Sequence, residues 1–297
     1  INSNRVQQGS NLNGLYLGYL RTAPDFDNTD YLGTYYSSTG TATLNAHRSY
    51  RNYIGSAAPA YNNPGWTIYE QSNPTSVYRF IINPELNWRI YKGINLTARY
   101  GFDYYNDVRE TFFPYNSAGA ESVGSFTRTE ITERNENLNV FINSTHILND
   151  NFNFSWIAGS AFESFNYSVI GGSSANFSNP YVGDLRIFGN ADAANEAPFL
   201  SRVRRKKSGV YGVINGELFQ QLYAEVTGRY ELSSTYNSRV FYPSVSLGWN
   251  FTKNLNLPIL NFGKLRASYG QVGVEPNPYV DQTTFNPFDL SSTWGDY

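Results

Sequence analysis

The sequence contains no cysteine and no methionine among its 297 residues. Without thiols the chain can form no disulfide, offer no thiolate nucleophile and hold no zinc through sulfur. It has only two histidines, His47 and His146, and no recognised motif surrounds either of them. The chain starts at Ile1 with neither the charged segment nor the apolar segment of a signal peptide. From these absences we expect an internal or mature piece of a longer protein.

Charge and long apolar runs are also scarce. Charged residues make up 15% of the chain and the formal net charge is -2, so no global field favours nucleic acid. Mean hydropathy is -0.46, and no apolar stretch approaches the roughly 18 residues of a transmembrane helix. The acidic residues are scattered without a focal motif. We therefore expect no catalytic residue, no metal site and no cofactor, and we do not expect an enzyme.

Aromatic residues are abundant, at 17% with 25 Tyr and 20 Phe. The most informative stretch is residues 78–104, where apolar and polar side chains alternate twice around a short turn at 91–93. Alternate side chains of a strand point to opposite faces, so each half predicts a strand with one apolar and one polar face. Each half is nearly twice the length of an ordinary strand of about five or six residues. That length suits a strand that crosses a bilayer at a tilt.

Similar alternation predicts further strands along the chain, and no segment shows a helical apolar period, so we expect little helix. These strands lie near residues 138–142, 152–158, 210–219, 223–232, 241–251 and 265–269. We count about nine or ten strands by the period-two pattern. Such a set does not close a barrel by itself, and lipid cannot form hydrogen bonds with the unpaired backbone groups of an open sheet edge. The sequence therefore predicts an all-β, antiparallel transmembrane β-barrel domain over 1–297 that is only a portion of a larger barrel.

The predicted connections alternate between short and long. The short ones are residues 91–93, 149–151, 220–222 and 252–262, and the long ones are about 21–76, 105–128, 166–207 and 233–240. Outer-membrane barrels have short periplasmic turns and long extracellular loops, so the alternation favours a membrane barrel and orients it. A soluble β-sandwich or propeller fits the composition equally well. Aromatic residues near strand ends, which would suit an interfacial girdle, are Trp88, Tyr104, Trp156, Tyr223 and Trp249.

Two segments carry a family resemblance. Residues 14–28 read GLYLGYLRTAPDFDN and resemble the G-L-x-L-G-x-L-R-T-P-P-D-F-D segment of SusC/RagA-like TonB-dependent outer-membrane transporters of Bacteroidetes. Residues 241–249 read FYPSVSLGW and residues 264–273 read KLRASYGQVG, similar to that family's F-P-S-V-S-x-G-W and L-K-L-R-A-S-Y-G-x-x-G-N strands. The departures are mild: Ala23 replaces a proline, Tyr242 interrupts the F-P pair, and Val274 stands in place of Asn.

The resemblance implies a barrel of about 22 strands with a plug domain in its lumen. It also implies a SusD-like surface lipoprotein as a lid, energy supplied through the TonB complex, and oligosaccharides or peptides as substrates. The plug and the TonB box would lie outside this chain. The alternative function is a non-transporting all-β surface adhesin or glycan-binding module.

Two sets of residues are candidates for contact with a substrate or plug. Aromatic residues in the predicted external loops could stack on sugars or clasp peptide side chains, or they could pack the loops against one another. They are Tyr61, Trp66, Tyr69, Phe112, Phe113 and Tyr115. The second set, Arg89, Arg99 and Asp103, should face the lumen if Trp88 and Tyr100 face lipid.

One dense charge run, Arg202-Val203-Arg204-Arg205-Lys206-Lys207, precedes a predicted strand. It could contact anionic lipopolysaccharide headgroups, an acidic patch on the lid protein or an anionic substrate. It could also be an ordinary solvated loop. A single run is too narrow for nucleic-acid binding.

Overall fold

The computed structural model describes residues 2–4, 13–36, 39–50, 60–180, 184–236, 238–253 and 260–280. The chain divides into two compact units that share its longest strands. Unit 1 comprises Ile1–Phe80, Tyr104–Glu133 and Tyr167–Arg202, and unit 2 comprises Ile81–Asp103, Arg134–Asn166 and Val203–Tyr297.

The first elements of the chain are short. They are β1 (Asn2–Asn4), α1 (Leu15–Leu20), β2 (Leu32–Tyr36), β3 (Ala42–His47), α2 (Pro64–Tyr69) and β4 (Pro74–Ile82). Helix α2 begins as its sequence dictates, because the side chain of Asn63 accepts a hydrogen bond of 2.7 Å from the Gly65 amide and Pro64 starts the first turn. No helix in the described parts of the chain is long and apolar enough to cross a membrane.

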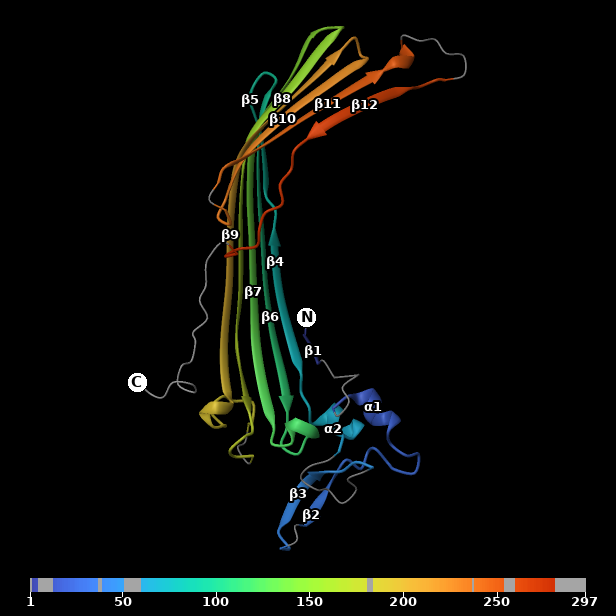
Figure 1. Cartoon of the computed structure of the whole chain (residues 1–297), viewed down its shortest axis with the longest axis vertical. Coiled ribbons are helices and arrows are strands. Elements are labelled where there is room, and N and C mark those ends of the chain that lie inside the picture. The colour runs from blue at the N-terminus through green and yellow to red at the C-terminus, as the bar shows by residue number, and fades with distance from the viewer. Residues whose placement is uncertain are drawn as a thin grey trace, which may run out of the picture. The chain divides into compact units, whose positions relative to one another are not determined.

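The remaining elements are mainly long strands that run side by side (Figure 1). They are β5 (Glu85–Tyr91), β6 (Ile94–Phe113), β7 (Ser125–Asn149), β8 (Phe152–Ala175), β9 (Glu196–Leu218), β10 (Leu222–Ser233), β11 (Val240–Asn250) and β12 (Lys264–Gly270). The 3-10 turns are η1 (Gly119–Glu121), η2 (Ala193–Asn195) and η3 (Phe251–Lys253). The sheet order is β1-β4-β6-β7-β8-β9-β10-β11-β12, with β5 also beside β6. The predicted β architecture is confirmed.

The predicted hairpin at 78–104 has one interruption that the alternation did not reveal. Its first half is two strands, β4 and β5, separated by Asn83 and Pro84. Proline has no N–H to donate to the ladder, so the strand breaks there. The Pro84 carbonyl still accepts a hydrogen bond of 3.1 Å from the Tyr100 amide, which keeps the segment beside β6.

The tight turns lie where the sequence predicted them, within one residue. Strand β5 ends at Tyr91 and β6 begins at Ile94, with Gly93 at a φ of 76°, which glycine adopts without strain. Strand β7 ends at Asn149 and β8 begins at Phe152, while β9 ends at Leu218 and β10 begins at Leu222. The connection from β11 to β12 includes residues 254–259, which lie outside the described residues.

The long connections are shorter than predicted, because the strands continue into them. Strand β6 extends to Phe113 and β7 starts at Ser125, where we predicted a loop over 105–128. Strand β8 extends to Ala175 and β9 starts at Glu196, so only about half of the predicted 166–207 loop remains. The connection from β10 to β11 is residues 234–239, close to the prediction.

Polar pairing explains why the sequence pattern missed these strand extensions. In unit 1, Asn106 on β6 donates a 2.9 Å hydrogen bond to Glu130 on β7, and Arg128 on β7 lies 2.6 Å from Glu110 on β6. Cross-strand polar pairs of this kind stabilise a ladder without any apolar face. The alternation of apolar side chains therefore ends before these strands end.

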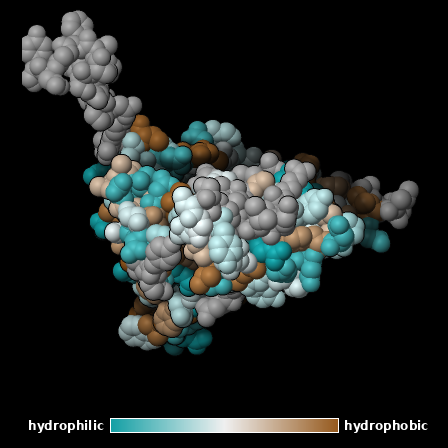
Figure 2. All heavy atoms as spheres, turned by 90° about the horizontal axis from the view of Figure 1, so that it is seen from below, coloured by the Kyte–Doolittle hydropathy of each residue, from teal (hydrophilic) through white to brown (hydrophobic). Residues whose placement is uncertain are grey.

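Unit 1 has a small aromatic core where these extended strands end. Phe112, Phe126 and Phe177 are buried against one another, with Leu185 packed on them. The rings of Phe112 and Phe177 are stacked with centroids 6.4 Å apart. The molecule viewed from below shows hydrophilic and hydrophobic residues intermixed rather than one continuous apolar surface (Figure 2).

Unit 2 presents two chemically different faces. We define its apolar face by exposed side chains that share one face by strand register: Leu86, Trp88, Val210, Ile214, Leu218, Leu222, Val226, Phe241, Val245, Leu247, Trp249, Leu265 and Tyr269. Its polar face holds the alternate positions: Glu85, Arg99, Tyr211, Asn215, Glu217, Glu225, Arg229, Glu231, Ser244, Ser246 and Arg266. Ile214 is 60% exposed and Leu265 is 63% exposed. So large an apolar surface on one side of a sheet requires lipid or protein to cover it.

Candidate functional site

The polar face of unit 2 begins on β5 and β6, where it holds the three residues predicted to face the lumen. The register places Arg89 opposite Asn95 and Arg99 opposite Glu85. Asp103 follows on the same side of β6, four residues after Arg99. The structure therefore brings all three onto one face. That this face lines a lumen remains a prediction.

Direct contacts stiffen this part of the polar face. The Arg99 Nε lies 2.6 Å from Glu85 Oε2, and Asn87 donates to the other oxygen of Glu85 at 2.6 Å. Thr97 in turn donates to the Asn87 amide oxygen at 2.8 Å. Arg99 also lies over the Phe141 ring, 5.5 Å from its centroid, a cation–π geometry. The side chains of β5, β6 and β7 thus form one connected polar surface.

A glycine lets this surface continue from β7 to β9. The Tyr211 hydroxyl on β9 donates a 2.8 Å hydrogen bond to Asn139 on β7, over β8, which lies between them. A Cβ at Gly159 of β8 would lie 2.7 Å from Phe141 Cβ and 2.7 Å from the Tyr211 hydroxyl. Only a residue without a side chain leaves room for this contact.

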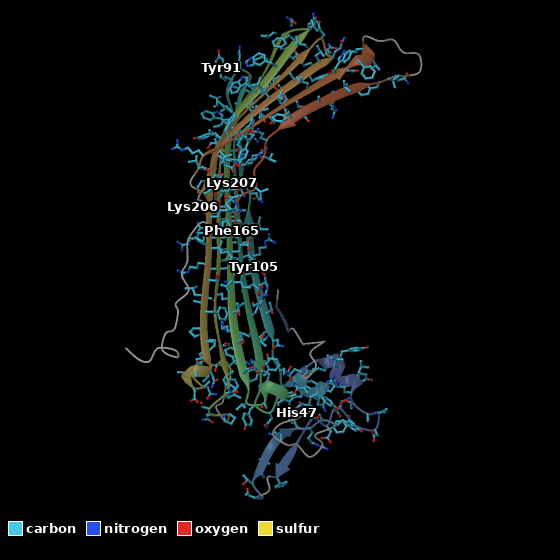
Figure 3. The ribbon with its side chains drawn as sticks, in the orientation of Figure 1. His47, Tyr91, Tyr105, Phe165, Lys206 and Lys207 are labelled. Carbon is cyan, nitrogen blue, oxygen red and sulfur yellow. The ribbon has the colours of Figure 1, made fainter. Side chains whose placement is uncertain are left out.

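The basic run lies within β9, not in a loop. Its side chains alternate, so its charges divide between the two faces. Lys207 and Arg205 lie on the polar face: Lys207 Nζ is 2.9 Å from Glu231 Oε1, and Arg205 is 5.7 Å from the Phe165 ring centroid. Arg202, Arg204 and Lys206 occupy the alternate positions and are exposed. Lys206 and Lys207 are adjacent midway along β9 (Figure 3).

Two carboxylates neutralise the cations of the basic run that lie on the polar face. Glu231 on β10 is 4% exposed and is bound by Lys207 and by Arg229, whose Nε lies 2.6 Å from Glu231 Oε2. Glu275, after β12, accepts a 2.8 Å hydrogen bond from Thr235 and lies 3.6 Å from Arg205 Nη1. A buried carboxylate persists as an ion when its charge is paired in this way.

Two hollows open on the polar face. One, of about 440 Å³, lies over β7, β8 and β9, and its polar lining includes Asn135, Asn137, Asn139, Glu163, Arg205 and Arg229. The other, of about 410 Å³, lies nearer the tight turns and is lined among others by Asn153, Asn215, Glu217, Glu225, Lys264 and Arg266. Among the described residues, no three His, Asp or Glu side chains gather to hold a metal ion. The hollows offer hydrogen bonds and paired charges to whatever fills them.

Four of the six predicted contact aromatics are buried in unit 1 and hold its loops together. Tyr61, Trp66, Phe112 and Phe113 are each less than 10% exposed. Tyr61 donates to the Arg21 carbonyl at 3.0 Å, and Trp66 donates to Ser117 at 3.1 Å. For these four residues, the alternative that the rings pack the loops against one another is therefore correct. The sequence could not distinguish packed rings from exposed substrate contacts, because both roles use the same amphipathic side chains.

The other two predicted contact residues remain accessible. Tyr69 is 71% exposed, and its ring stacks on Tyr31 with centroids 5.6 Å apart. Tyr115 is half-buried. The role of these two in contacting a substrate stays a prediction.

His47, to which the sequence assigned no role, lies at the centre of a buried junction in unit 1 (Figure 3). Its Nε2 accepts a 2.9 Å hydrogen bond from the Asn63 amide, and its Nδ1 lies 3.1 Å from the Asn116 carbonyl. The ring stacks on Trp66 with centroids 4.4 Å apart. Burial lowers the pKa of His47 to about 4, so the ring is neutral at physiological pH and donates its Nδ1–H to Asn116. No motif in the sequence signals this junction.

One proposed member of the aromatic girdle lies on the wrong face. Tyr223 is opposite Gly248 and Glu217 on the polar face, and Lys264 Nζ lies 4.2 Å from its ring centroid. A one-residue difference in register reverses a side chain's face, and Tyr223 is the second residue of β10, whose register its turn fixes. Trp88 and Trp249 lie on the apolar face as predicted. Trp156 donates a 3.3 Å hydrogen bond to His146.

Comparisons with known proteins agree with this architecture. A family model described as "TonB dependent receptor-like, beta-barrel" matches residues 2–296. A solved structure of the RagAB peptide transporter superimposes with a TM-score of 0.68 and 17% identity, over 88% of this chain and 31% of that chain. The RagAB peptide importer in its "closed-closed" state gives a TM-score of 0.67 and 16% identity, with the same 88% and 31% coverage.

No curated protein matches the chain. At identities of 17% and 16% the structural likeness shows the fold. The chain corresponds to 31% of the length of each of these solved proteins.

Proposed function

This chain belongs to the TonB dependent receptor-like β-barrel family, and from that membership we propose that it forms part of the wall of an outer-membrane importer. The observation that supports the proposal is the division of unit 2 into an apolar face and a polar face. A transmembrane barrel needs an apolar band toward lipid and a polar interior. A water-soluble sheet would cover such an apolar face with a second layer.

The height of the apolar face fits a membrane. On β9 the apolar side chains run from Val210 to Leu218, which is about 26 Å along the strand at about 3.3 Å per residue. At a tilt of about 40° this gives a height of about 20 Å, close to the apolar band of about 25 Å that is typical of outer-membrane barrels. The tight turns at one end of the band then lie in the periplasm, and the residues predicted as external loops lie outside the cell.

We propose that Arg89, Arg99 and Asp103 contact the plug or line the transport path. Their face carries the hollows that a plug or cargo would fill. The energy source in the proposal is the TonB complex, acting through a plug and TonB box elsewhere in the protein. A SusD-like lipoprotein is the proposed lid, and oligosaccharides or peptides are the proposed substrates. RagAB, one of the similar structures, is described as a peptide transporter.

Deletion of the parent gene tests this function. We expect the deletion strain to lose growth on one class within a panel of oligosaccharides and peptides supplied as limiting nutrients. The intact gene should restore growth, and a gene whose TonB box is removed should not. Growth that is unaffected on every substrate, with the protein still binding glycans at the cell surface, would instead support the adhesin alternative. A protein that is extracted without detergent would contradict the barrel itself.

A further inference from the structure

Of the three exposed cations in the basic run, Arg202 belongs to unit 1, and Arg204 and Lys206 lie on the apolar face of unit 2. Arg204 and Lys206 are at even positions of β9, as are Val210 and Ile214, whose exposed side chains belong to that face. Their neighbours Arg205 and Lys207 point the other way and are bound by Glu275 and Glu231. Charges on the lipid side of a barrel are destabilising in the middle of the band and tolerated at its edges.

These cations lie at the edge of the band, at the end away from the tight turns. The apolar side chains of β9 run from Leu218 at the turn to Val210, and Ser208 and then Lys206 follow on that face. The same transition occurs on β7, where Leu138 is followed on its face by Glu136 and Arg134. The charged side chains therefore lie at the level of the lipid headgroups when the band spans the bilayer.

The charges at this edge do not cancel. Arg134 is 2.7 Å from Glu136, and Glu136 also receives a 3.1 Å hydrogen bond from the Tyr100 hydroxyl. Lys206 lies close enough to Glu136 to interact with its charge. With Arg204, this cluster holds three cations and one carboxylate, a net charge of +2. Among the described side chains, this cluster therefore lacks the carboxylates that would balance its charge.

We propose that Arg204 and Lys206, beside the Arg134–Glu136 pair, form a binding site for the phosphate of a lipopolysaccharide headgroup in the outer leaflet. Arginine and lysine are the side chains that bind phosphate, and an exposed apolar surface directly below them accommodates acyl chains. The inference rests on the proposed membrane orientation, because the opposite orientation would place these cations in the periplasmic leaflet. In this proposal, Arg205 and Lys207 form ion pairs on the polar face, and Arg204 and Lys206 bind lipid on the apolar face.

The test compares two variants of the full-length transporter purified in detergent. The first is Arg204→Gln with Lys206→Gln, and the control is Arg205→Gln, which removes a cation of the same run from the opposite face. Each protein is mixed with diphosphoryl lipid A, with dephosphorylated lipid A, or with inorganic phosphate. Retained lipid is counted by native mass spectrometry. Each cation near an anionic surface contributes about 1 kcal/mol to the binding free energy. The double variant should therefore bind diphosphoryl lipid A about 30-fold more weakly than the unaltered transporter.

We expect the double variant to lose diphosphoryl lipid A and the Arg205→Gln control to retain it. Both variants should bind dephosphorylated lipid A weakly. Equal retention by both variants would overturn the proposal. So would preference for dephosphorylated lipid, or for inorganic phosphate over the lipid. Loss of binding to the lid protein, with lipid retention unchanged, would assign the cations to that partner instead. Cell-surface labelling and nutrient growth are measured in parallel, because failure of membrane insertion or of import would contradict the proposed function and not this site.

Discussion

At the residue scale, the structure gives a packing role to aromatic side chains that were predicted to contact a substrate. It also gives a structural role to His47, for which the sequence predicted none. Trp66 and Phe112 pack the loops of unit 1 instead of presenting exposed rings. His47 binds backbone groups from two loops, the Asn63 amide and the Asn116 carbonyl. A neutral imidazole can donate and accept at once, which is what this junction requires. Protonation would remove the acceptor for Asn63.

This junction predicts a pH dependence. The pKa of His47 is lowered to about 4 in the fold from about 6.5 in the unfolded chain, so its stabilising contribution is complete above pH 6.5. The contribution is lost as the pH falls from 6.5 toward 4. At pH 5 the loss is about 2 kcal/mol, at about 1.4 kcal/mol per pH unit.

An NMR titration of the imidazole checks this expectation, with His146 as the internal comparison. The His47 signal should remain that of a neutral ring down to pH 5. A midpoint at or above pH 6 would contradict the buried junction. In a His47→Gln variant, the stability of this region should no longer change between pH 7 and pH 5.

At the element scale, each long strand changes its chemistry along its length. The part of β7 in unit 2 has an apolar face at Leu138, whereas its part in unit 1 carries Arg128 and Glu130. The pairing of β6 with β7 continues through both parts, since backbone hydrogen bonds and polar cross-strand pairs do not depend on an apolar face. The strand length is therefore set by pairing and the band height by side-chain composition.

The alternation of faces on β9 predicts very different effects on stability for substitutions at adjacent positions. Ile214→Arg places a charge at the centre of the apolar face and should destabilise the membrane-inserted barrel by about 2–4 kcal/mol. Asn215→Arg, one residue further, lies on the polar face and should change stability by less than about 0.5 kcal/mol. Denaturant unfolding in lipid vesicles measures both. Equal effects would mean that the register of β9 is shifted.

At the scale of the whole molecule, the proposal places different parts of one strand in different solvents. The chain has no native cysteine, so single cysteines can report solvent directly. Val108 and Leu96 lie at even positions of β6, in unit 1 and unit 2 respectively. In intact cells a water-soluble maleimide should label Val108→Cys and leave Leu96→Cys unlabelled. Both should react after denaturation. Labelling of both in intact cells would contradict membrane immersion of unit 2.

The sequence by itself determined the β class, the tight turns and the apolar and polar faces of the strands, because these depend on neighbours along the chain. Glycine and asparagine turns and a period of two are local properties. It also contained the motifs from which the family resemblance was drawn, and the family match over residues 2–296 agrees with it.

Only the tertiary structure decided which side chains meet. The length of β6 and β7 depends on pairs such as Arg128 with Glu110, which are 18 residues apart in the chain. The burial of Trp66 depends on Ser117, and the division of the basic run depends on Glu231 and Glu275. Such partners are distant in sequence, so no local pattern encodes them. Their contacts separate residues that hold the fold from residues that remain free to bind.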